Sequence, residues 1–206
     1  MDNLIISVGR QLGSGGCEIA MMLAKEFGCK FYDSELINMA AERSGFNPRL
    51  FANTDESHGP LRHIFGSFSS RIGRMGGTFY NNSISQESLF QVQSEVIWKA
   101  AHEGPCVFVG RCADYILRDS SRLFSVFITA DDDVRAQVVS ERLGCDAVTA
   151  RKFIYKKEAE RASYYNYYTS KRWGASQSYD LCINSSMLGL NRTAELIAQI
   201  IRERFE

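Results

Sequence analysis

The chain has 206 residues, a length that fits one domain with a substantial hydrophobic core. Lysine plus arginine number 24, as do aspartate plus glutamate, so no net charge attracts nucleic acid or an acidic membrane surface. No signal peptide opens the chain, and no apolar run approaches the ~20 residues of a membrane-spanning helix. We expect a cytoplasmic protein without nucleic-acid or membrane partners, and the oligomeric state stays open.

Short apolar segments alternate with helical ones in the first half of the chain. Residues 4–8 predict a strand, and a helix follows from about Gly16 to Phe27 with Gly28 at its end. Its apolar face is formed by Ile19, Met22, Leu23 and Phe27. Lys30–Asp33 predicts a short strand. The stretch from about 34 to 82 begins as a helix and becomes rich in Gly, Ser and Asn, which indicates an excursion from the core.

The same alternation continues in the second half. A helix is predicted over Gln86–Glu103, with Leu89, Val92, Val96 and Ala100 on one face. Strands are predicted at 106–109, 123–129 and 180–184. A short helix is predicted to end at Leu117, and longer helices from 131 to 143 and from about 146 through 168. A last helix is predicted at the end of the sequence, where Leu196, Ile197, Ile200 and Ile201 are apolar.

Strands that are apolar on both faces and alternate with helices predict an α/β fold. We expect one domain over residues 1–206, with a five-stranded parallel sheet and helices on both faces. Ligands of such sheets bind at the carboxyl ends of the strands.

Neither the cysteines nor the histidines are spaced as metal ligands. Cys17, Cys29, Cys106, Cys112, Cys145 and Cys182 form no C-x-x-C pair, and four of them fall in apolar runs or helices. We expect reduced, mostly buried thiols. His58, His63 and His102 have no suitable spacing to cysteines or carboxylates, so no protein metal site is expected.

Residues 9–16 form a glycine-rich turn between the first strand and the first helix. Glycines let successive backbone N–H groups turn toward an anion, and the helix presents the positive end of its dipole. The pattern G-x-x-x-x-G-K-[ST] is not met, because five residues instead of four separate Gly9 from Gly15, and Gly16 replaces the lysine. The predicted phosphate- and nucleotide-binding residues are Gly13, Ser14, Gly15, Gly16 and Cys17.

Other polar groups follow the ends of neighbouring predicted strands. Asp33 ends the second strand, Gly110-Arg111 ends the third, and Ala130-Asp131 ends the fourth. An arginine at the sheet edge beside a glycine loop favours an anion site over a plain turn.

These residues together resemble a known family. GRQLGSGGCEIA, FYD, VFVGRCADYIL, KEAERASYYNYYT and YDLCIN, in this order, resemble the cytidylate kinase-like proteins, a branch of the nucleoside monophosphate kinases. The similarity covers nearly the whole chain and is weakest between about 45 and 85. It implies a P-loop three-layer sandwich, with an acceptor-binding excursion at about 34–82 and a lid at about 146–175.

The resemblance also implies roles for single residues. Asp33 and Arg111 match residues that bind the acceptor. Glu158 and Arg161 match the D-x-x-R pair of the lid. Phosphoryl transfer still needs a cation where Gly16 lies, and Arg10 in the loop or Arg161 on the lid is the expected substitute, with Arg161 favoured. The candidate catalytic residues are therefore Arg161, Arg10 and Glu158.

The predicted activity is phosphoryl transfer from ATP, with Mg²⁺, to a small nucleotide. CMP or dCMP is the acceptor that the resemblance implies, and another small acceptor is the alternative on the same fold. A nucleotide-binding regulatory protein without turnover is the other alternative, because the loop lysine is missing. Two tyrosine pairs, 164–165 and 167–168, fit either stacking on a base or packing of the lid helix.

Overall fold

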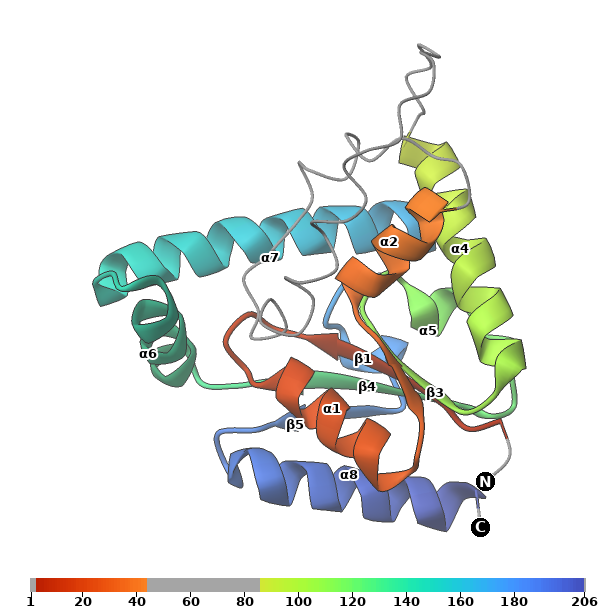
Figure 1. Cartoon of the computed structure of the whole chain (residues 1–206). Coiled ribbons are helices and arrows are strands. Elements are labelled where there is room, and N and C mark those ends of the chain that lie inside the picture. The colour runs from red at the N-terminus through yellow and green to blue at the C-terminus, as the bar shows by residue number, and fades with distance from the viewer. Residues whose placement is uncertain (1–2, 44–85, 206) are drawn as a thin grey trace, which may run out of the picture.

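Five parallel strands form the centre of the protein in a computed structural model that describes residues 3–43 and 86–205 (Figure 1). The strands are β1 (Ile5–Arg10), β2 (Lys30–Tyr32), β3 (Cys106–Val109), β4 (Leu123–Thr129) and β5 (Leu181–Asn184). Their order in the sheet is β2-β3-β1-β4-β5, and every neighbouring pair is parallel. After β1 the chain continues toward the β2 edge of the sheet, and after β3 it continues toward the β5 edge. The direction of the strand order therefore changes between the neighbouring strands β1 and β3.

Helices cover both faces of this sheet (Figure 1). They are α1 (Gly16–Glu26), α2 (Ser34–Arg43), α4 (Gln86–Glu103), α5 (Ala113–Ile116), α6 (Asp132–Leu143), α7 (Ala147–Thr169) and α8 (Gly189–Phe205). Alternate strand residues face opposite sides: Ile6 and Val8 pack with α1 and α8, while Ile5 and Phe108 pack with α2, α4 and α5. The predicted parallel α/β sheet is confirmed.

The predicted α4 occurs over the expected residues, but its buried face is shifted. Val92 and Ala100 are buried as expected, whereas Gln93 and Ile97 are fully buried and Leu89 and Val96 only partly. The shift arises because the Gln93 amide finds a buried partner: its Nε2 donates to Asn38 Oδ1 on α2 over 2.9 Å. A pattern of apolar residues cannot include a glutamine that is buried by a hydrogen bond.

Two further expectations meet the structure differently. β1 continues to Arg10, which pairs with Ile128 of β4, so Arg10 is a strand residue rather than a loop residue. All six cysteines are free as expected, but only Cys106 and Cys112 are buried, and Cys182 is exposed. Their expected general burial is therefore wrong, since α1 and β5 leave some thiols near the surface.

Much of the predicted excursion lies outside the described residues. Of the range 34–82, the structure describes α2, and His58 and His63 belong to the part that it does not describe. Among the residues it describes, none of the helices is long and apolar enough to cross a membrane. The same residues contain no cluster of three or more metal-binding side chains.

Candidate phosphate-binding and acceptor site

The glycine-rich turn between β1 and α1 has a backbone that only glycine adopts easily. Gly13 and Gly15 have φ values of 80° and 71°, in the left-handed region. A Cβ on Gly13 would lie 2.8 Å from the Arg135 carbonyl oxygen, and one on Gly15 would lie 2.3 Å from Leu190 Cδ2. The turn is therefore packed closely on its outer side, and Gly15 caps α1 so that the N-terminal N–H groups of the helix open onto it.

Distant parts of the chain hold this turn in place. The Gln11 side chain accepts a hydrogen bond from Ala130 N at 3.3 Å, and Gln11 N donates to Ile128 O at 2.9 Å. The buried Ser14 receives a hydrogen bond at its carbonyl oxygen from Ser185 Oγ at 2.7 Å. The turn is thus fixed before any ligand arrives, which lowers the entropic cost of binding an anion.

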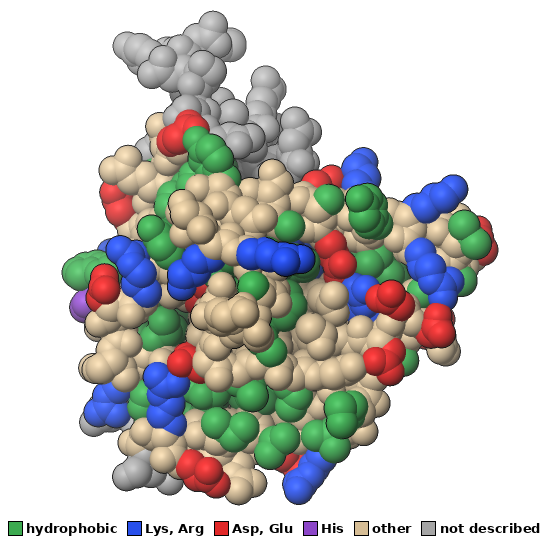
Figure 2. Space-filling model, turned by 180° about the vertical axis from the view of Figure 1, so that it is seen from behind, with side chains coloured by type: hydrophobic (Ala, Val, Ile, Leu, Met, Phe, Trp, Pro, Cys, Tyr) green, Lys and Arg blue, Asp and Glu red, His purple; other side chains and the backbone are tan. Residues whose placement is uncertain are grey.

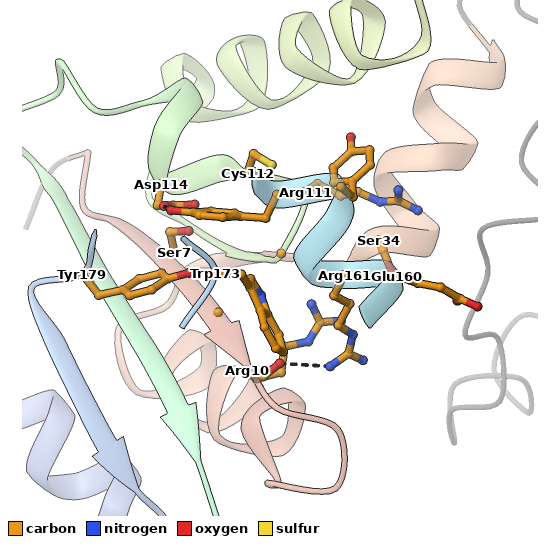
Figure 3. A pocket seen from close by; sticks show the side chains of 14 residues that line it. Ser7, Arg10, Ser34, Arg111, Cys112, Asp114, Glu160, Arg161, Trp173 and Tyr179 are labelled. Atoms are coloured by element: carbon orange, nitrogen blue, oxygen red, sulfur yellow. Dashed lines mark hydrogen bonds between the residues drawn. The ribbon is translucent and has the colours of Figure 1, made fainter. Parts of the chain in front are cut away.

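A cavity of about 160 Å³ opens beside the turn, at the carboxyl ends of β1 and β3 (Figure 3). These neighbouring strands flank the reversal of strand order, where ligands of open parallel sheets bind. Figure 3 shows Asp114, Ser7 and Tyr179 at one end of the cavity and Arg161 with Glu160 at the other. The lining residues are Ser7, Gly9, Arg10, Ser34, Gly110, Arg111, Cys112, Asp114, Glu160, Arg161, Tyr164, Tyr165, Trp173 and Tyr179.

The residues of the E-x-x-R sequence both face the glycine-rich turn from α7. Their spacing of three puts them on one side of the helix. Glu158 Oε1 accepts a hydrogen bond from Leu12 N at 3.1 Å and a further one from the Arg135 guanidinium. Arg161 Nη1 donates to the carbonyl oxygen of Arg10 at 2.9 Å, the dashed line in Figure 3. The hydrogen bonds of Glu158 and Arg161 therefore hold α7 against β1 and the turn.

Arg111 enters the cavity from the turn after β3. Gly110 and Arg111 both have positive φ, which directs the chain sharply away from the sheet. The buried Arg111 Nε lacks a hydrogen-bond partner within the described part of the chain, and the guanidinium carbon lies 5.5 Å from the Tyr164 ring centroid. A guanidinium that lies beside an aromatic ring, on a residue that lines the cavity, is suited to bind an anion.

The Tyr164 side chain is held in place by a hydrogen bond to α4. Its hydroxyl donates to Gln93 Oε1 at 2.8 Å, and burial raises the pKa of this phenol, so the hydroxyl stays protonated. Gln93 donates onward to Asn38, which joins α7, α4 and α2 beneath Arg111. Sequence reasoning missed Gln93, because its partners lie on other helices.

A model of the cytidylate kinase-like family matches residues 5–187, a range that includes the turn, Arg111 and the whole of α7. The chain belongs to the cytidylate kinase-like family. This confirms the resemblance derived from the motifs. No curated protein matches the sequence.

Several solved structures share this fold. An uncharacterised protein from Eubacterium ventriosum ATCC 27560 is 28% identical, with a TM-score of 0.74, over 98% of this chain and 99% of that one. Shikimate kinase from Bacteroides thetaiotaomicron is 11% identical, with a TM-score of 0.53, over 98% and 99% of the chains. Shikimate kinase from Acinetobacter baumannii, in complex with shikimate, is 13% identical, with a TM-score of 0.50, over 98% and 94%. At these identities the two kinases establish the fold alone, which is that of P-loop kinases.

Three of the predicted site residues, Arg10, Arg111 and Arg161, line the cavity. The others do not line it; they are Gly13, Ser14, Gly15, Gly16, Cys17, Asp33 and Glu158. Asp33 Oδ1 accepts from Leu36 N at 2.9 Å and so caps α2, while the next residue, Ser34, lines the cavity. Cys17 occupies the position after Gly16 where the motif has a hydroxyl. Burial raises the pKa of the Cys17 thiol to about 11, against an opposing effect of Arg10, so Cys17 is uncharged at neutral pH.

Of the aromatic end of the cavity, the sequence pointed to Tyr165, as a member of a tyrosine pair that fits base stacking or packing, but not to Trp173 or Tyr179. The Tyr165 hydroxyl donates to the buried Asp114 Oδ2 at 2.7 Å, and Tyr165 stacks on Tyr179 with centroids 6.2 Å apart. Burial raises the pKa of Asp114. Of the two tyrosine pairs of α7, Tyr164 and Tyr165 line the cavity, whereas Tyr168 packs on Phe90 with ring centroids 4.0 Å apart. Tyr167 is largely exposed.

Proposed function

We propose that the protein is an ATP-dependent kinase that moves the terminal phosphoryl group to a small acceptor, with CMP or dCMP as the first candidates. The observation that carries this proposal is the convergence of Arg10, Arg111 and Arg161, from three different elements, on one cavity beside the phosphate-binding turn. Membership in a kinase-like family and the P-loop kinase fold support a small-molecule kinase.

Phosphoryl transfer needs positive charge around the transferring group and little covalent chemistry from the protein. The turn and the start of α1 offer backbone N–H groups to the donor phosphates. Arg111 lies across the cavity from the turn, where an acceptor phosphate would be bound through two parallel N–H bonds. Arg161 on α7 donates a hydrogen bond to the Arg10 carbonyl oxygen. When donor and acceptor are bound, the proposed partner of this guanidinium is a phosphate oxygen instead.

The residues beside the turn fit magnesium only as an ion carried by the nucleotide. The neutral, soft thiol of Cys17 is a poor ligand for this hard cation. Magnesium in such sites keeps several waters and is held through substrate phosphates and one or two carboxylates. The carboxylates whose charges are felt at Cys17 are those of Glu18 and, more weakly, Asp33. When bound, magnesium would neutralise charge on the phosphates.

The acceptor base or ring is proposed to lie at the aromatic end of the cavity. Trp173, Tyr179 and Tyr165 provide apolar faces there, with the Asp114 carboxylate and the Ser7 hydroxyl as polar groups. A flat ring with hydrogen-bond donors fits this lining. The same lining suits a small hydroxylated ring, which keeps a different acceptor as the alternative.

A coupled assay of ADP formation tests the proposal. The enzyme is mixed with ATP, magnesium and, one at a time, CMP, dCMP, UMP, AMP and small hydroxylated acids. We expect ADP release that depends on the acceptor and is fastest with CMP or dCMP. ATP binding without turnover on any acceptor would instead support a nucleotide-binding regulator, the function that the absent lysine at Gly16 favours.

A further inference from the structure

The start of α1 lacks the expected lysine, and a side chain from β1 occupies the space that the lysine would need. A Cβ built on Gly16 would lie 2.5 Å from Arg10 Cβ and 3.1 Å from Arg10 Cγ. Non-bonded carbon atoms do not approach so closely, since dispersion contacts are optimal at about 3.5–4.0 Å. A side chain at position 16 therefore does not fit while the Arg10 side chain runs past the start of α1.

The direction of Arg10 follows from the strand. Successive residues of β1 point to opposite faces, so Arg10 points to the same side as Val8, which packs against α1. The far end of the side chain reaches the turn after β3: Nη1 would be 2.4 Å from a Cβ on Gly110. Arg10 thus spans the gap between the start of α1 and the Gly110-Arg111 turn, and two glycines leave room for it.

The charge of Arg10 is felt where a loop lysine would act. The Arg10 guanidinium opposes the rise in the pKa of Cys17, the second residue of α1, more strongly than Arg161 does. Arg10 also lines the cavity at the carboxyl ends of the strands. Its backbone is fixed as well, by pairing with Ile128 and by the hydrogen bond from Arg161.

We propose that Arg10 supplies, from the strand, the phosphate-binding charge that the lysine of a G-K-[ST] loop supplies from the helix. Its ligand is the β- and γ-phosphate oxygens of a nucleoside triphosphate, which a guanidinium binds with a two-pronged geometry. This inference rests on the proposed function for the identity of the ligand. It assigns to Arg10 the role for which the sequence favoured Arg161.

Binding measurements with two matched variants test the assignment. Arg10→Met and Arg10→Lys both keep an unbranched stem beside Gly16, and only the second keeps a charge. Calorimetry would measure ATP and inorganic tripolyphosphate, with Arg118→Met, an exposed residue away from the cavity, as the control. We expect Arg10→Met to weaken both ligands by about 10- to 100-fold, as loss of a charged hydrogen bond does, and Arg10→Lys to weaken them less.

A charge-exchange variant gives a result that a merely structural Arg10 would not give. Gly16→Lys alone is expected to bind poorly, because its Cβ meets Arg10. Arg10→Gly combined with Gly16→Lys moves the charge back to the helix and also removes the Arg10 Cβ that a side chain at position 16 would meet, so we expect binding within about 10-fold of the original protein. Circular dichroism melts establish that each variant is folded.

The outcomes separate this inference from the proposed function. ATP and tripolyphosphate binding by folded Arg10→Met at the original affinity would overturn the inference, whatever the turnover. Failure of the unaltered protein to bind either ligand would overturn it too. If the unaltered protein binds ATP, Arg10→Met does not and no acceptor is phosphorylated, the inference stands and the kinase proposal fails.

Discussion

The Gln93→Leu substitution is expected to destabilise the protein and to weaken acceptor binding. Gln93 is fully buried and makes hydrogen bonds of 2.9 Å to Asn38 and 2.8 Å from Tyr164. Leucine fills nearly the same volume, so the main effect is the loss of both bonds. A buried polar group left without its partner costs about 1–3 kcal/mol. With two such groups we expect a loss of about 2–5 kcal/mol in the free energy of unfolding.

Urea denaturation followed by circular dichroism measures this loss. The slope of the transition should stay unchanged, since the exposed area on unfolding is the same. Tyr164→Phe is the matched second change, because it removes the hydroxyl that Gln93→Leu leaves unpaired. The double variant should therefore be more stable than the sum of the single effects by about 1–2 kcal/mol.

Acceptor kinetics give the functional half of the same prediction. Tyr164 supports the Arg111 guanidinium from 5.5 Å, so a displaced ring should raise the KM for the acceptor and leave the KM for ATP nearly unchanged. Strict additivity of Gln93→Leu and Tyr164→Phe, or a stability loss below about 0.5 kcal/mol, would refute the reasoning.

Three other predictions concern residues at the cavity. Arg111→Lys keeps the charge but loses the bidentate geometry of the guanidinium, so acceptor binding should weaken by about 1–3 kcal/mol while ATP affinity stays the same. An equal loss of affinity for both substrates would make Arg111 a structural residue. Burial raises the pKa of Asp114, so the folded state holds its proton more tightly than the unfolded state. The free energy of unfolding should therefore fall as the pH rises from about 3.9, the pKa of an unfolded aspartate, through the raised pKa of Asp114. Urea midpoints of Asp114→Asn should lack this fall, and an identical pH dependence in both proteins would contradict the assignment. With its pKa near 11, Cys17 should react slowly with iodoacetamide at pH 7 and faster toward pH 11, by peptide mass spectrometry; fast labelling at pH 7 would show a thiolate instead.

Most elements could be predicted because their signals are local. The 123–129 strand is buried on both faces and reads as a continuous apolar run, and α7 begins at Asp146, whose side chain accepts from Val148 N and Thr149 N. The strand order and the buried face of α4 depend on partners far away in the chain, such as Asn38 for Gln93, and no local pattern contains them.

The candidate site was predictable where a residue follows a strand. Arg111 was found in this way, because the carboxyl ends of parallel strands share one edge. The close approach of Arg10 to Gly16 could not be predicted from the sequence, because it depends on how near β1 and α1 lie to each other in the fold. The bond between Asp114 and Tyr165 joins residues 51 apart in the chain and leaves no trace in either segment alone.

Charge is spread over the surface without a single sign. Figure 2 shows lysine and arginine interspersed with acidic side chains on one face of the molecule. This mixture agrees with the formal net charge of zero.

The contacts of the glycine-rich turn have a consequence for how the protein is made. Leu12 N is bonded to a residue 146 positions later, and the Ser14 carbonyl to one 171 positions later. Contacts of such separation form late, because long loops must close first. Because Glu158 lies on α7 and Ser185 follows β5, the turn takes its final shape only after β5 has been synthesised.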